Sequence, residues 1–186
     1  MQYFTILATA ALAALSSASP EPIFGRSSNV ARAGTCMSLA EAQQVTNNFE
    51  NLVGTGYSDT LATEAMAEDF NDYSDSVTSL IDAGCTGPQP LGVATFTSRA
   101  EFMVAQSQQP PLPFQLLSMW YNCDTVFIHW KAPLPPQQVT GIIVIETTPA
   151  PAGGPYSWLI QTVYSEFNSG AWLVDVDTFV PSNCTA

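Results

Sequence analysis

The chain offers few side chains that could act as general acids or bases. His129 is the only histidine, so any imidazole base must be this residue. On the strand predicted for residues 125–132, His129 lies on a mixed face, opposite an apolar face made of Val126, Ile128 and Trp130. A mixed face either lines a cavity or meets solvent. His129 is therefore interpreted as a structural histidine or, alternatively, as a general base or a metal contact, although the spacing offers no second metal ligand.

Asp72 and Asp75 are the second group of candidates, and Tyr73 lies between them. A short strand over residues 70–73 would place Phe70 and Asp72 on the same face. A carboxylate inside an apolar cavity has a raised pKa, because desolvation disfavours its charged form, and this suits proton abstraction. The alternative is that these Asp residues cap helices and form turns.

Tyr164 and Glu166 form a third candidate pair, on a predicted strand that also carries Trp158, Ile160 and Thr162 on the same face. If that face looks into a cavity, Tyr164 is a phenolic donor and Glu166 is an acid or a rim residue. Otherwise they are a core tyrosine and a solvated glutamate. Several aromatic residues could line such a pocket: Phe70, Tyr73, Phe102, Trp120, Trp130, Trp158, Tyr164 and Trp172.

Other kinds of chemistry lack their motifs. The sequence contains no serine-nucleophile elbow, phosphate loop, HExxH or CxxC, so we expect no cofactor. No two of the four cysteines are close enough to form a zinc half-site, and we expect no metal. An even number of cysteines in a secreted chain predicts two disulfides, with three pairings open: the cysteines are Cys36, Cys85, Cys123 and Cys184.

Composition and the first residues indicate a secreted protein. Among 186 residues, four Lys+Arg face sixteen Asp+Glu, a net charge of −12, which argues against nucleic-acid and anionic-membrane partners. Residues 1–18 read as a signal peptide, because the apolar run is too short to span a membrane and ends in small residues. Residues 19–34 read as a flexible leader, with Arg26 or Arg32 as trimming sites. One domain is expected over residues 35–186.

Helices are predicted in the first half of that domain and strands in the second. Two capping boxes, Ser38 to Glu41 and Ser98 to Glu101, open helices that end near Gly54 and Gln108. Between them lie a short helix after Ser58, a strand over 70–73, a helical turn over 76–82 and a short strand over 93–97. Strands follow at 114–122, 125–132 and 139–148, and a hairpin over 153–180 turns at residues 168–170.

This order predicts an α+β domain, in which helices pack on one face of a curved, mostly antiparallel sheet. A curved sheet closed by helices is a cone, and the end of a cone is a natural pocket.

Four strings cover nearly the whole domain: CMSLAEAQQVTNNFENL at 36–52, EDFNDYSDSVTSL at 68–80, QPPLPFQLLSMWYNCDT at 109–125 and VYSEFNSGAWLVD at 163–175. With the order of elements, they resemble the NTF2-like (SnoaL-like) superfamily, and more closely its secreted fungal members of undefined function. The resemblance implies a cone with a cavity between helices and sheet. It also implies the pairing Cys36–Cys123 and Cys85–Cys184, and a homodimer formed through the sheet.

The superfamily includes dehydratases, isomerases, cyclases, transport factors and binders, so the resemblance does not choose an activity. We expect a secreted binder of a small apolar ligand, lined by Tyr73, Phe102, Trp120, Trp130, Trp158, Tyr164 and Glu166. One alternative is a cofactor-independent lyase or isomerase using Asp72 or His129 with Tyr164, which requires ionisable groups that converge in a cavity. Another is an extracellular interaction protein whose cone is filled.

Overall fold

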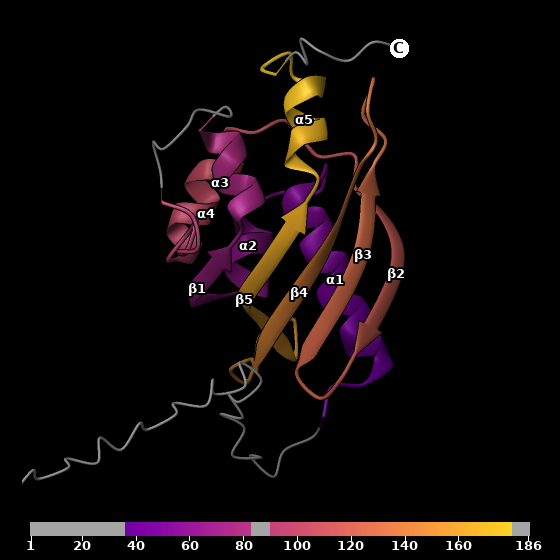
Figure 1. Cartoon of the computed structure of the whole chain (residues 1–186). Coiled ribbons are helices and arrows are strands. Elements are labelled where there is room, and N and C mark those ends of the chain that lie inside the picture. Colours follow the sequence, from indigo (N-terminus) through magenta and orange to yellow (C-terminus); the bar gives the residue numbers. More distant parts are fainter. Residues whose placement is uncertain (1–35, 83–89, 180–186) are drawn as a thin grey trace, which may run out of the picture. The chain divides into compact units, whose positions relative to one another are not determined.

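A five-stranded curved sheet carries the domain in the computed structural model, which describes residues 36–82 and 90–179 (Figure 1). The strand order is β1-β5-β4-β3-β2, and only the β1–β5 pair is parallel. The expected α+β fold is confirmed. The strands are β1 (Met66–Tyr73), β2 (Gln115–Tyr121), β3 (Thr125–Ala132), β4 (Val139–Pro149) and β5 (Trp158–Phe167).

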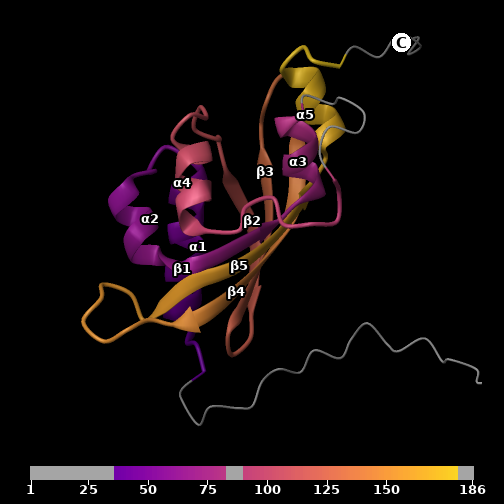
Figure 2. The ribbon, with the colours of Figure 1, turned by 90° about the vertical axis from the view of Figure 1, so that its left-hand side faces the viewer.

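Five helices accompany the sheet: α1 (Leu39–Val53), α2 (Asp59–Ala65), α3 (Asp75–Ile81), α4 (Arg99–Gln106) and α5 (Ser169–Asp175). α1 crosses β2, β3 and β5 on the inner face of the sheet, with α2 and α4 beside it (Figures 1 and 2). α3 and α5 stand next to each other where β1 and β5 end. Among the described residues, no helix is both long and apolar enough to cross a membrane.

The helix starts follow from local capping. Ser38 and Glu41 exchange the two bonds of a capping box, in which the Glu41 carboxylate accepts from the Ser38 amide at 2.8 Å. Ser98 also caps its helix. However, the Glu101 carboxylate accepts from the amide of Thr97 at 2.7 Å instead of from Ser98, so the second capping box is formed only in part.

Burial confirms the predicted faces of α1 and β3. α1 buries Ala42, Val45, Phe49 and Leu52 at spacings of three and four. β3 alternates perfectly, with Val126, Ile128, Trp130 and Ala132 buried and the residues between them half-buried. The strand predicted over 93–97 is reduced to one bridge between Asp72 and Phe96, in which the Asp72 amide donates to the Phe96 carbonyl at 2.9 Å.

The predicted hairpin over 153–180 is wrong in its second half, which is α5. β5 already has β4 on one side and β1 on the other, so a strand that folds back from β5 would find no free edge on it. Instead, the Asn168 side chain accepts from the Ala171 amide at 3.1 Å and caps a helix. The residues expected to form the turn thus begin α5.

The faces of β5 also differ from the prediction. The β4–β5 register slips between Glu146 and Thr147. Glu146 pairs with Thr162 and Thr147 pairs with Ile160, so Gln161 is an extra residue on β5. Such a bulge reverses the alternation for all residues beyond it. Ile160 is buried before the bulge, and Val163 and Ser165 are buried after it. The expectation that Tyr164 and Glu166 share the face of Ile160 is therefore wrong.

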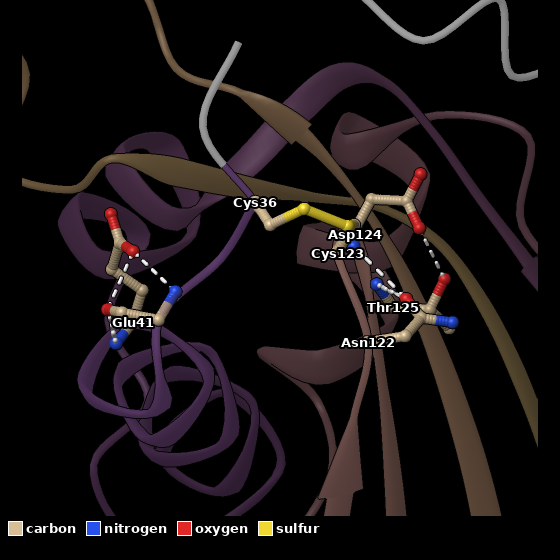
Figure 3. Close-up of a disulfide and its surroundings, with 7 residues drawn as sticks. Cys36, Glu41, Asn122, Cys123, Asp124 and Thr125 are labelled. Carbon is tan, nitrogen blue, oxygen red and sulfur yellow. Dashed lines mark hydrogen bonds between the residues drawn. A yellow bond between two sulfur atoms is a disulfide. The ribbon is translucent and has the colours of Figure 1, made fainter.

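A disulfide joins Cys36, just before α1, to Cys123 in the β2–β3 turn (Figure 3). Next to it the Met37 amide donates to the Cys123 carbonyl at 2.9 Å. The side chain of Asn122 accepts from the amides of Asp124 and Thr125 and shapes the same turn. The pairing Cys36–Cys123 is confirmed, whereas Cys85, Cys184, the signal peptide and the leader lie outside the described residues.

Removal of the Cys36–Cys123 bridge should destabilise the domain substantially, because the bridge closes a sequence separation of 87 residues. The chain-entropy relation for such a loop gives about 4–5 kcal/mol. We expect the C36S/C123S double variant to lose an amount of this order in unfolding free energy, measured by urea titration monitored by circular dichroism. An unchanged transition midpoint would show that the bridge does not constrain the unfolded chain.

Candidate functional site

A cavity of about 390 Å³ lies between the helices and the inner face of the sheet. Its sheet wall comes mostly from β5 and its neighbours: Phe70, Trp130, Ile143, Val163 and Phe167. α4 adds Phe102 and Ala105, α3 adds Ile81, and Val176 lines the cavity from the position directly after α5. Because Ile81 and Val176 line the cavity and are also about half exposed, the described part of the chain places its mouth near the ends of α3 and α5.

Aromatic rings make up one continuous wall of the cavity. Trp130 stacks on Phe114 with ring centroids 5.1 Å apart, and Phe167 meets Trp130 edge-on at 5.8 Å. Phe167 in turn contacts Trp172 of α5 at 5.2 Å. Gly141 makes room for this wall, because a Cβ there would lie 2.9 Å from Nε1 of Trp130 and 2.6 Å from Cβ of Phe167.

Asp72 is the one ionisable residue among the described residues that line the cavity. Its side chain is only 6% exposed, and no described group donates a hydrogen bond to its Oδ1. Burial, with a smaller contribution from the nearby negative charge of Glu166, raises the pKa of Asp72 to about 7. At neutral pH this carboxyl can therefore either donate or accept a proton.

Few other polar groups reach the cavity. Ser165 lines it from β5, and Gln106 and Gln109 line it from α4 and the segment that follows. The indole nitrogen of Trp130 is buried without a described partner, and it lies directly against Gly141. The cavity therefore combines one buried carboxyl with largely apolar walls.

The sequence-based candidates divide between the two faces of the sheet. Asp72, Phe102 and Trp130 line the cavity. His129 lies on the outer face of β3, and Tyr164 lies on the outer face of β5, where its ring stacks on Tyr73 at 5.3 Å. The structure does not bring His129 or Tyr164 together with Asp72.

Three further candidates also lie away from the cavity lining. Trp120 is 56% exposed on β2, and Trp158 packs partly buried at the start of β5. Glu166 has a structural role: its carboxylate accepts from the amides of Asp75 at 3.0 Å and Ser76 at 3.1 Å, and from the Ser76 hydroxyl. This contact holds the first turn of α3 against the end of β5.

Sequence reasoning missed Val163, Ser165 and Phe167 as cavity residues. Their inward direction follows from the bulge at Gln161, and the one local signal is the adjacent polar pair Gln161 and Thr162, which breaks the alternation. Ser165 lies between Tyr164 and Glu166 in the sequence and gives no signal of its own. Phe49 and Phe114 could be predicted as core residues, but not as cavity walls.

The raised pKa of Asp72 predicts a pH dependence of stability. Between about pH 4 and pH 7 the folded protein keeps a proton on Asp72 that the unfolded chain has lost, so stability falls as pH rises through this window. In the D72N variant this loss is absent. The unfolding free energy of D72N minus that of wild type should therefore increase by up to about 4 kcal/mol between pH 4 and pH 8. Urea titration at each pH measures both values.

D69N is the matched control, because Asp69 is an exposed residue of the same strand. The unfolding free energies of D69N and wild type should change with pH in nearly parallel curves. A D72N profile that is also parallel to wild type would show that Asp72 is solvated in the folded state.

A family model described as NTF2-like domain matches residues 35–179, while the comparison with curated proteins gave no match. Solved structures that are similar to this chain include the following three. A SnoaL-like protein of unknown function from Burkholderia thailandensis E264 is 16% identical, with a TM-score of 0.49 over 71% of this chain and 98% of that chain. A putative ketosteroid isomerase from Kribbella flavida DSM 17836 is 12% identical, with a TM-score of 0.47 over 69% of this chain and 78% of that chain.

An NTF2-like protein of unknown function from Cytophaga hutchinsonii ATCC 33406 is 8% identical, with a TM-score of 0.44 over 68% of this chain and 89% of that chain. Likenesses at such low identity concern the fold and transfer no activity. The family match covers most of the chain, including every element that surrounds the cavity. The chain belongs to the NTF2-like family.

Proposed function

We propose that this protein is a secreted binder that holds a small, mostly apolar ligand in its cavity. The observation that carries the proposal is a cavity of about 390 Å³ with aromatic walls, within the size range of small-molecule sites. Empty apolar space in a protein is unfavourable, because the atoms that line it lose dispersion contacts. A ligand would restore those contacts.

Secretion is part of the same proposal. A disulfide between Cys36 and Cys123 persists in an oxidising compartment, and the net charge of −12 suits solubility outside the cell. The predicted signal peptide over residues 1–18 agrees with both.

The alternative functions have less support. A lyase or isomerase that combines Asp72 or His129 with Tyr164 would need these groups on one side of the sheet, and the structure places His129 and Tyr164 on the outer face. A pure interaction protein with a filled cone does not agree with the cavity volume. Binding is therefore the function that the geometry favours.

Binding should depend on the free volume beside α4. Ala105 lines the cavity, so a phenylalanine at this position would occupy the space that a ligand needs. Val104 is its neighbour on the outer side of the same helix and is 62% exposed, which makes V104F a matched control. With 2-(1-naphthyl)ethanol as the probe in isothermal titration calorimetry, we expect binding at one site in wild type and V104F. A105F should weaken binding by about tenfold or more.

If A105F binds the probe as tightly as V104F, the probe occupies another site and the proposal is wrong. Absence of binding to wild type would also overturn it. Circular dichroism of both variants verifies that the fold is intact.

We also propose that a second copy of the chain covers the outer face of the sheet. One register row runs across all five strands and is apolar throughout: Tyr73, Tyr164, Val144, Phe127 and Trp120. Ile142, beside this row, is 50% exposed, and no described helix covers this face (Figures 1 and 2). An exposed apolar stripe of this kind is typical of an interaction surface.

The dimer can be tested by placing a charge in the apolar row. In sedimentation velocity, wild type should have twice the mass of one chain at micromolar concentration, and W120E should be monomeric, because two copies of the variant would bury opposed carboxylates. V104E, on the exposed side of α4, should remain dimeric. A monomeric wild type would contradict the proposed dimer.

A further inference from the structure

We propose that the cavity selects ligands that carry a single cationic amine on an apolar body, in preference to neutral or anionic ligands of the same shape. This inference names the chemical class of the ligand and rests on the proposed binding function. It is carried by the position of Asp72, the absence of cations among the described lining residues and the aromatic walls.

Asp72 provides an unpaired acceptor at the cavity wall. Its carboxyl is buried among apolar groups, and Oδ1 has no described hydrogen-bond partner. A buried carboxylate is costly unless it is paired with a cation or a strong donor. The ammonium group of a ligand supplies both, because it carries the opposite charge and three N–H donors.

No cation of the described residues lies at this place. None of the described residues that line the cavity is Lys, Arg or His. His129 and Lys131 lie on the outer face of β3, and the Arg99 guanidinium donates to the carbonyls of Thr63 and Met66. In the part of the chain that the structure describes, no side chain complements an ionised Asp72, and a cationic ligand would supply that complement.

Glu166 strengthens the preference for positive charge. Its carboxylate, on the opposite face of β5, already disfavours ionisation of Asp72. A cation beside Asp72 would be attracted by both carboxylates, and a ligand carboxylate would be repelled by both. The net charge of −12 acts in the same direction over longer distances.

The aromatic walls suit the rest of such a ligand. The rings of Phe70, Phe102 and Trp130 are close enough to the same space to contact an apolar body. Their π faces also attract an ammonium group or its adjacent methylenes. An amine attached to an aromatic or alkyl group fits both features of the cavity.

The test compares three probes that share one ring system: 2-(1-naphthyl)ethylamine, 2-(1-naphthyl)ethanol and 1-naphthylacetic acid. Their dissociation constants are measured by calorimetry at about pH 8, where Asp72 is ionised and the amine is protonated. We expect the amine to bind about tenfold to a hundredfold more tightly than the alcohol, since hydrogen bonds between charged groups are the stronger ones. The acid should bind more weakly than the alcohol.

D72N separates the role of the charge from that of the cavity. The variant should lose about tenfold or more in affinity for the amine and keep its affinity for the alcohol within about twofold. D69N, on the exposed side of β1, should behave as wild type with all three probes. Circular dichroism and the alcohol affinity report whether D72N remains folded.

The outcomes distinguish the two proposals. If the alcohol binds in the cavity but the amine binds no more tightly, or if D72N leaves the amine affinity unchanged, the inference about charge is wrong and the binding function stands. If the acid binds as tightly as the amine, the inference is also overturned. If no probe binds, the proposed function itself fails.

Discussion

The contact between the end of β5 and the first turn of α3 is the constraint on which the site depends. Glu166 accepts from the amides of Asp75 and Ser76, and the Ser76 hydroxyl accepts from the Phe167 amide at 3.0 Å. With Glu166 fixed on the outer face, the alternation of a strand directs Ser165 and Phe167 inward. Burial is the main cause of the raised pKa of Asp72, and the same carboxylate contributes to it. One contact therefore positions the cavity wall and influences its electrostatics.

The cavity exists because large and small side chains are unevenly distributed across the sheet. Trp130 is fully buried on β3 and lies over Gly141 of β4, where no side chain competes for space. The ring is held between Phe114 and Phe167, so it forms a wall and does not fill the interior. α3 and α5 meet at the end of the strands instead of inserting between sheet and helices. The enclosed space is mainly apolar, and Asp72 is its one described charge.

Much of the fold could be predicted from local patterns. The cap at Ser38 and the faces of α1 and β3 depend on residues three or four apart, or on strict alternation, and all are observed. Phe70 and Asp72 share one face of β1, as the strand predicted over residues 70–73 implies, and the structure shows that this face is buried. The candidate site was predicted only in part. Asp72, Phe102 and Trp130 line the cavity, whereas His129, Tyr164 and Glu166 do not.

The sequence by itself determined the helices of the first half and the strands β2 to β4, because capping and periodicity act over a few residues. Tertiary structure decided the rest. Pairing of β5 on both sides turned residues 169–175 into a helix, and the bulge at Gln161 reversed the faces of Tyr164 and Ser165. Both effects arise from neighbouring strands distant in sequence, so no local pattern records which side chains finally share the cavity.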